Sequence, residues 1–325
     1  MEEIKLLKTF DEVSKMITDG GLLHIAGSEE LLRKLPKGKW IGGSTEYFID
    51  ENGGIVSDEL VFVTEFPYET FIAKTYDITT INNVASDAFE YGYSILIIPF
   101  DSDIHKTYAE NAADYTGMFV NRIVGWISGV NLKKPGQVPI VVNGVTGEVY
   151  TDRGVALHLD VPGKKDIQIN IVNIFEQDES SPTIKFMKTG FSVDKCLING
   201  KETVFSKYIE ENKIDTKLPF VGDYSGIGVN ISIKSIDNGI VNLYAPVFEH
   251  IEYKFAKDIP DYATVLGSLI EKTENTDVLC SYTCILNFLY GDLEGKKIKS
   301  FTGPVTFGEI AYQLINQTLV YVTIQ

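Results

Sequence analysis

The sequence predicts an α/β protein, with α+β as the alternative, built from two modules that share an interface. Its 325 residues exceed the size at which a single hydrophobic core usually stops growing. Helical and strand patterns alternate along the first half of the chain. A polar run from Glu176 to Pro182 is typical of a connection between units. We therefore expect modules at 1–176 and 183–325, with mixed sheets covered by helices, a pattern compatible with αββα layering.

The first module alternates helical patterns with short apolar strands. Residues 8–19 carry apolar side chains at helical spacing near the cap candidates Thr9 and Asp11, which predicts a helix. Ser28 begins a short helix that ends before Pro36, and apolar spacing predicts a long helix over 108–128. Apolar runs predict strands at 22–26, 40–41, 60–63, 94–98, 138–142 and 155–159.

The second module contains two hairpin signals. The dipeptides at 199–200 and 238–239 are Asn-Gly pairs between apolar runs, the preferred composition of a tight hairpin turn. Helical patterns cover 203–212 and 262–271. Strands are expected at 184–193, 229–236, 240–246, 278–284 and 318–324.

Charge and cysteine content exclude several classes of protein. The formal net charge of −16 argues against nucleic acid and anionic membrane as primary partners, since both need a basic surface. Three irregularly spaced cysteines do not form a disulfide framework, which favours a reducing cytoplasm. We find no apolar stretch approaching a membrane helix and no signal peptide.

A glycine–threonine–carboxylate pattern recurs at 41–46, 143–148 and 302–309, each time followed by a strand. Glycine permits close backbone approach, and threonine supplies a hydroxyl at a turn. The three turns would converge on one polar pocket, although ordinary β-turns are the alternative. Two further segments, 222–226 and 287–292, combine tyrosine, carboxylate and glycine, which suits ligand stacking or plain surface turns. The candidate ligand-binding residues are Ser44, Thr45, Glu46, Thr146, Tyr224, Asn287, Tyr290, Thr306 and Glu309.

The C-terminal part of the sequence resembles a known family. The segment 306–310, Thr-Phe-Gly-Glu-Ile, and the following Asn-Gln-Thr-Leu at 316–319 resemble the closing signature of FIST domains. Residues 194–201 resemble the entry hairpin of the C-terminal FIST module, and 42–45 and 143–144 stand where the N-terminal module carries Gly-Gly turns. The resemblance implies an intracellular sensory module that binds a small ligand, such as an amino acid or related metabolite.

This chain departs from the family pattern at 280–286, where the family's arginine is absent. An acidic pocket without this cation would favour a cationic or neutral ligand, with Glu46 or Glu309 paired to an ammonium group. The hydroxyls and Asn287 would orient that ligand. We expect no attached signalling segment, so a sensory role would act through a separate partner protein.

We therefore expect a non-catalytic, cytoplasmic protein that binds a small metabolite and needs no cofactor or metal. One alternative is a metal-dependent hydrolase that uses Asp101, Asp103 and His105, because an Asp-x-Asp pair after a buried strand can hold a hard cation. Caps at the start of a helix explain the same residues. The second alternative is an acidic interaction module with no small ligand.

Overall fold

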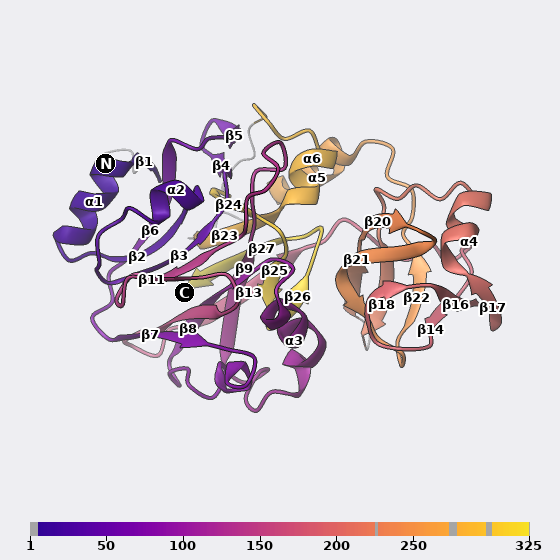
Figure 1. The fold of residues 1–325 in the computed structure, drawn as a ribbon, viewed down its shortest axis with the longest axis horizontal. Coiled ribbons are helices and arrows are strands. Elements are labelled where there is room, and N and C mark those ends of the chain that lie inside the picture. The colour runs from indigo at the N-terminus through magenta and orange to yellow at the C-terminus, as the bar shows by residue number, and fades with distance from the viewer. Residues whose placement is uncertain (1–5, 225–226, 273–277, 297–300, 325) are drawn as a thin grey trace.

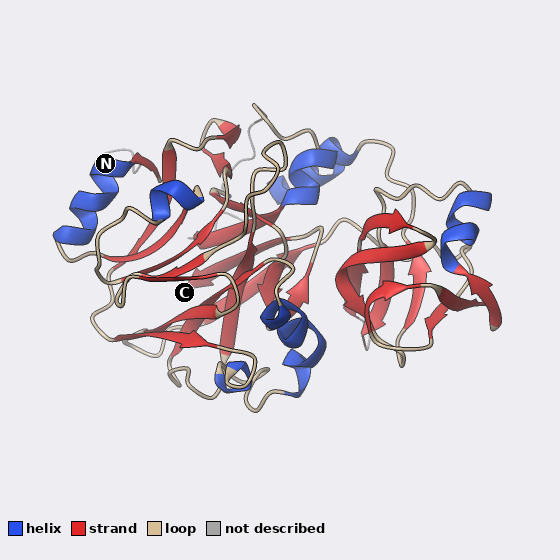
Figure 2. Cartoon of the chain, in the orientation of Figure 1, coloured by secondary structure: helices blue, strands red, loops and turns tan. Residues whose placement is uncertain are grey.

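The computed structural model describes residues 6–224, 227–272, 278–296 and 301–324. It confirms the predicted α/β class: mixed sheets dominate, with 44% strand against 16% helix, so helices cover only part of the sheet faces (Figures 1 and 2). The described elements form a large body and a smaller unit inserted into it.

Three six-stranded sheets form the body. The first runs in the order β1 (Leu7–Thr9), β6 (Leu60–Phe66), β2 (Leu22–Gly27), β3 (Trp40–Ser44), β10 (Val141–Asn143) and β11 (Glu148–Tyr150). The second runs β26 (Gln313–Ile315), β25 (Glu309–Ala311), β9 (Arg122–Ser128), β8 (Gly92–Pro99), β12 (Gly154–Asp160) and β7 (Phe71–Tyr76). The third runs β13 (Ile167–Val172), β27 (Leu319–Ile324), β23 (Val278–Cys284), β24 (Gly303–Thr306), β4 (Tyr47–Asp50) and β5 (Gly53–Val56).

Each body sheet contains a parallel strand pair within its described strands. The pairs are β2 with β3, β8 with β9, and β23 with β24. A helix lies between the two strands of each pair along the chain: α2 (Glu29–Leu32), α3 (Asp103–Asn111) and α6 (Ile285–Tyr290). The second strands of these units, β3, β9 and β24, end in one region of the body.

The three sheets meet around aromatic side chains. His24 of β2, Trp126 of β9 and Tyr282 of β23 lie with ring centroids 5.8 to 6.5 Å apart, and Trp126 Nε1 donates to His24 Nε2. Helix α1 (Phe10–Thr18) packs Val13 and Ile17 on the outer face of the first sheet, and its predicted Thr9 cap is confirmed. Helix α3 buries Ile104 and Tyr108 in the cluster beyond the second sheet. The first and second sheets therefore lie between α1 and α3, which gives four successive layers, and the third sheet lies beside them.

The inserted unit is antiparallel throughout its described strands. One sheet runs β17 (Lys201–Val204), β16 (Lys195–Ile198), β14 (Ile184–Phe186), β22 (Glu252–Phe255), β18 (Phe220–Tyr224) and β19 (Ile227–Ile231). The other runs β15 (Gly190–Val193), β21 (Ile240–Val247) and β20 (Ile233–Asp237), and α4 (Phe205–Glu211) belongs to the same unit. The unit lies at one end of the molecule, to the right in Figure 1.

The chain returns from the inserted unit to the body through α5 (Tyr262–Lys272). Strand β27 then pairs with β13, β25 with β9, and β24 with β4. Strands from 278–324 thus complete sheets begun by the first half of the chain, so the expected modules 1–176 and 183–325 are not separate sheet systems. The polar run at 176–182 does mark the entry into the inserted unit.

Two predicted elements are wrong. The helix expected over 108–128 ends at Asn111 and is followed by a short 3-10 helix, Ala112–Asp114, a turn with Gly117 at φ +82°, and the strand β9. Residues 123–127 are buried on both faces, so their apolar spacing does not indicate a helical stripe. The strand expected over 184–193 is two strands in different sheets, β14 and β15. A second 3-10 helix spans Ile81–Asn83.

Among the described helices, none has the length and apolar character needed to cross a membrane.

Candidate functional site

The ends of the three β-α-β units join through hydrogen bonds. At the end of β3, Ser44 exchanges backbone and side-chain bonds with Gly129, which follows β9, at 2.7 and 2.8 Å. Thr45 Oγ1 donates to the carbonyl of Val305 in β24 at 2.8 Å. Ligands commonly bind at the carboxyl ends of parallel strands, so this junction is the first place to look for a site.

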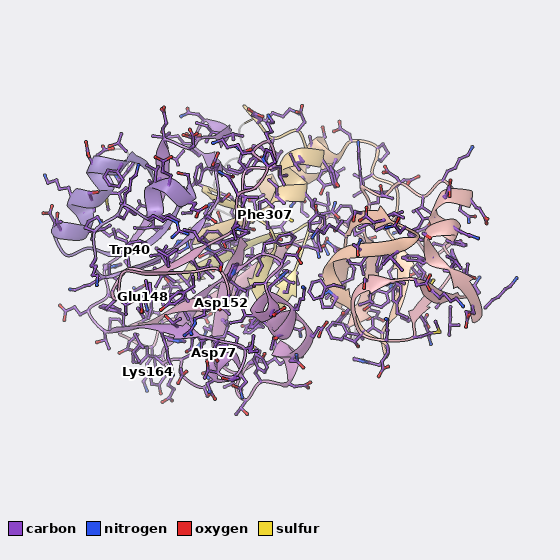
Figure 3. The ribbon with its side chains drawn as sticks, viewed as in Figure 1. Trp40, Asp77, Glu148, Asp152, Lys164 and Phe307 are labelled. Atoms are coloured by element: carbon purple, nitrogen blue, oxygen red, sulfur yellow. The ribbon has the colours of Figure 1, made fainter. Side chains whose placement is uncertain are left out.

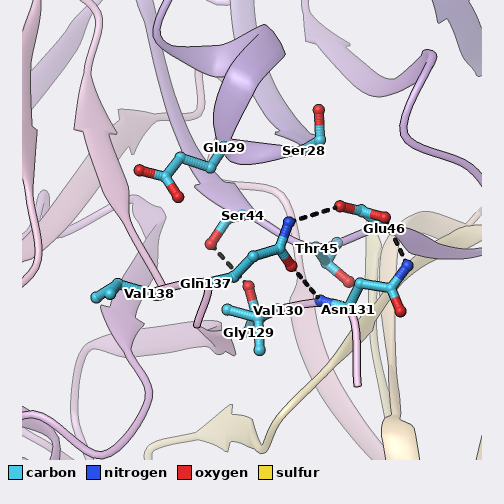
Figure 4. Close-up of a pocket in the computed structure, with 10 residues that line it drawn as sticks. All are labelled: Ser28, Glu29, Ser44, Thr45, Glu46, Gly129, Val130, Asn131, Gln137 and Val138. Carbon is cyan, nitrogen blue, oxygen red and sulfur yellow. Dashed lines mark hydrogen bonds between the residues drawn. The ribbon is translucent and has the colours of Figure 1, made fainter. Parts of the chain in front are cut away.

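A buried carboxylate lies at the junction. Glu46 is 3% exposed and accepts hydrogen bonds from three side chains of the loop 129–138. Asn131 Nδ2 lies 2.7 Å and Gln137 Nε2 3.2 Å from its oxygens (Figure 4). Lys134 Nζ lies 2.8 Å from Glu46 Oε2. Lys134 also binds Asp58 at 2.7 Å. The loop therefore covers Glu46. Its Lys134 supplies the ammonium group that the sequence analysis expected a ligand to provide.

The cavity beside Glu46 has a volume of about 10 Å³. Ser44, Thr45 and Glu46, which the sequence predicts to act together, do line it. This volume accommodates about one water molecule. A metabolite therefore has no room here while the loop stays closed.

Thr306, Glu309 and Asn287 form a second predicted group, which the structure also brings together. Glu309 is fully buried and accepts from Thr306 Oγ1 and Thr318 Oγ1, each at 2.7 Å. Asn287 Nδ2 donates to the Thr318 carbonyl at 2.9 Å. Burial raises the pKa of Glu309 to about 8 despite these hydrogen bonds. These residues bond to one another in the core and line none of the cavities described here.

The remaining candidates lie apart. Thr146 is exposed, and its hydroxyl donates to the Asn143 carbonyl within its own turn. That turn packs over Trp40. Figure 3 shows Glu148, which follows the turn, away from Phe307. Tyr224 belongs to the inserted unit, where its hydroxyl contacts that of Tyr253 at 3.3 Å. Tyr290 ends α6 and packs half-buried against the main core.

A larger groove lies between the body and the inserted unit. Its volume is about 410 Å³, within the range of small-molecule sites. The end of β8 and helix α3 form one wall, and strands β15, β20 and β21 form the other. Its lining residues are Phe100, Asp101, His105, Lys106, Phe191, Ser192, Lys234, Ser235, Asp237, Asn242 and Leu243.

His105 is the buried polar group of this groove. Ser102 caps α3 by accepting from the His105 backbone N–H at 3.2 Å, which fixes the residue in the first turn. The side chain is 2% exposed, and its ring lies 5.5 Å from Phe100 and 5.4 Å from Phe191. Its Nε2 has no hydrogen-bond partner among the described residues. Burial lowers the pKa of His105 to about 3, so the ring is neutral near pH 7.

Asp101 is held by lysines. Lys234 Nζ lies 2.9 Å and Lys106 Nζ 3.7 Å from its carboxylate. Burial is the largest single effect on Asp101 and opposes its ionisation, but the hydrogen bond with Lys234 and the positive charges of Lys234 and Lys106 together outweigh it and hold the pKa below its ordinary value. Asp103 does not line the groove. Among the described residues, no group of three or more His, Cys, Asp or Glu side chains could hold a metal ion.

Phe307 links the two places. Its ring packs against Gly129 so closely that a Cβ there would lie 1.9 Å from Phe307 Cδ2. The Phe307 ring also contacts the Phe100 ring, with 5.5 Å between the two centroids. Gly129 lines the Glu46 cavity and Phe100 lines the groove, so Phe307 touches a residue of each.

Sequence reasoning missed most of the groove. Phe191 and Lys234 lie on the inserted unit, and tertiary folding alone brings them to α3. Lys134 and Gln137 also carried no signal, because their role depends on a carboxylate about ninety residues earlier in the chain.

The comparisons with known proteins place the chain in one family. Residues 8–325 match the model of a family of unknown function, DUF6976, and the chain belongs to it. Neither the curated proteins nor the solved structures gave a match.

Proposed function

We propose that this protein is a non-catalytic cytoplasmic binding protein that takes a small metabolite in the groove between the body and the inserted unit. The observation that carries the proposal is His105, a buried side chain in the wall of a groove of about 410 Å³, whose Nε2 meets no partner within the described parts of the chain. Leaving a buried polar group unsatisfied costs about 1–3 kcal/mol, which a ligand would relieve.

The groove also has the composition of a binding site. Two phenylalanines provide apolar surface, and charged and amide side chains provide polar anchors. Its walls come from two units that are far apart in sequence, a common location for ligands. A sensory role through a separate partner, as the FIST resemblance implies, would use movement of these units.

Binding is favoured over metal-dependent hydrolysis at this place. Asp101 is engaged by two ammonium groups, and Asp103 lies outside the groove. A hydrolytic metal would need carboxylates free to coordinate it.

The test is a thermal-shift screen of the full chain against amino acids, organic acids, amines, nucleotides and sugars, with calorimetry on the hits. Ser192→Trp, which adds a large side chain to a residue of β15 that lines the groove, should abolish binding. Thr70→Trp, an exposed position outside the cavities described, should not. Absence of any hit, or hits that survive Ser192→Trp, would contradict the proposal.

A further inference from the structure

The hydrogen bonds of His105 define where its proton lies. The backbone N–H of Asp101 donates to His105 Nδ1 at 3.3 Å, so Nδ1 is an acceptor. A neutral imidazole carries its single proton on the other nitrogen. Nε2–H is therefore a buried donor that finds no acceptor among the residues that the structure describes. A ligand that places an acceptor atom beside this nitrogen would satisfy the donor.

The charges beside His105 favour a negative acceptor. Lys106 and Lys234, one from each wall, both approach the single carboxylate of Asp101, so two ammonium groups meet one carboxylate beside His105. The second carboxylate of the groove, Asp237, accepts instead from Ser235 Oγ and, at 3.0 Å, from Asn242 Nδ2. A ligand anion placed at Nε2–H would face the lysines and gain charge-assisted hydrogen bonds.

The apolar lining favours a ligand with a hydrophobic part. Phe100 and Phe191 flank the His105 ring, and Lys234 Nζ lies 4.8 Å from the centre of the Phe100 ring. A flat apolar group would stack there while its acidic group reaches His105.

We infer that the groove recognises a small organic anion, a carboxylate or a phosphate ester with an apolar portion, through His105 Nε2–H, Lys106 and Lys234. This inference rests on the proposed function and narrows it. It differs from the cationic or neutral ligand that the missing arginine favoured, because the lysines of the groove supply the cations.

Four matched probes test the class on the full-length protein: benzoate, phenyl phosphate, benzylamine and benzyl alcohol. Benzoate or phenyl phosphate should raise the melting temperature and bind in calorimetry, and whichever of these two acts identifies the acidic group. Benzylamine and benzyl alcohol should bind at least roughly tenfold more weakly, because they lack the charge-assisted hydrogen bonds. Tighter binding of benzylamine, or no binding by any probe, would overturn the anion class. The outcome of the wider screen with Ser192→Trp judges the groove itself.

Variants assign the anchors. His105→Phe and Lys234→Met should each weaken the anionic probe at least roughly tenfold, whereas His105→Gln, which retains a donor, should lose less. Lys207→Met, an exposed lysine of α4 outside the groove, is the matched control. His105→Phe should leave the protein folded, since it removes an unsatisfied donor among aromatic rings. Unchanged affinity in both His105→Phe and Lys234→Met would overturn the inference.

Discussion

Buried ionisable side chains make the stability of this protein depend on pH, and the histidines and Glu309 act in opposite directions. Burial lowers the pKa values of His24 and His105 to about 3, and that of His158 to about 4. The unfolded chain takes up these protons first as the pH falls below about 6.5, so each histidine lowers stability in that range. Glu309 raises stability at low pH instead, because its pKa in the folded protein is raised to about 8.

Glu309→Gln tests this on the alkaline side. The folded wild type holds the Glu309 proton more tightly than the unfolded chain, so this contribution is present below about pH 4.5 and is lost as the pH rises through 8. We expect the wild type to lose about 2 kcal/mol between pH 6 and 8 from this group, and the variant to lose little of it. Urea unfolding at both pH values measures the difference. Parallel losses in variant and wild type would contradict the raised pKa, and exposed Glu252→Gln is the control.

Gly129→Ala tests the packing of Phe307. The new Cβ would collide with the Phe307 ring, and overpacking typically costs about 1–3 kcal/mol. A displaced Phe307 should also perturb Phe100 and weaken ligand binding in the groove. Gly267→Ala is the matched control, because a Cβ there meets nothing within 4 Å. Equal melting temperatures for the two variants would show that Phe307 does not hold Gly129 tightly.

At the scale of single elements, the loop 129–138 is held chiefly by polar contacts. Glu46 accepts from three of its side chains, and Tyr47 Oη accepts from the Leu132 backbone N–H at 3.0 Å. A loop fixed in this way depends on one buried carboxylate.

Glu46→Gln should therefore release the loop. The amide removes the charge that Lys134 binds, at a cost of about 1–3 kcal/mol for the charge-assisted hydrogen bonds. Hydrogen exchange should quicken at 130–138 and change little in β9 before it. Glu29→Gln is the control, since Glu29 lines the same cavity but pairs with Arg33 of its own turn. Unaltered exchange in Glu46→Gln would exclude Glu46 as the anchor.

Local patterns predicted elements well where one face or one turn decided them. The Thr9 cap and the turn at Asn238-Gly239 fall where expected, because capping and hairpin chemistry act between near neighbours. Residues 122–128 were misjudged because apolar side chains on both faces of a buried strand also fit helical spacing. Thr45 reaches Val305 as the predicted junction requires, but the third segment there is the one after β9, where Gly129 bonds to Ser44, and not the turn at Thr146.

At the scale of the whole molecule, non-local pairing decides what the sequence could not show. The body needs β24, β25 and β27 from the end of the chain. The two connections to the inserted unit run together: Gln177 bridges Ala256, and the Lys257 N–H donates to the Glu176 carbonyl at 3.0 Å.

Removal of the inserted unit should thus leave a folded body. A chain with Gln177 joined to Ala256 by a short glycine–serine loop should unfold cooperatively and keep its strand content by circular dichroism. Neither fragment 1–176 nor fragment 183–325 should fold the complete body, because only the full chain supplies the pairings of β13 with β27, β4 with β24 and β9 with β25. A native-like, cooperatively unfolding fragment 1–176 would contradict this architecture.

The most direct measurement is a crystal structure of the full chain with the tightest ligand from the screen. We predict density in the groove against Phe100 and Phe191, with an oxygen of the ligand about 2.7–3.2 Å from His105 Nε2. Density beside Glu46 after the loop 129–138 has opened, or anywhere else outside the groove, would contradict it.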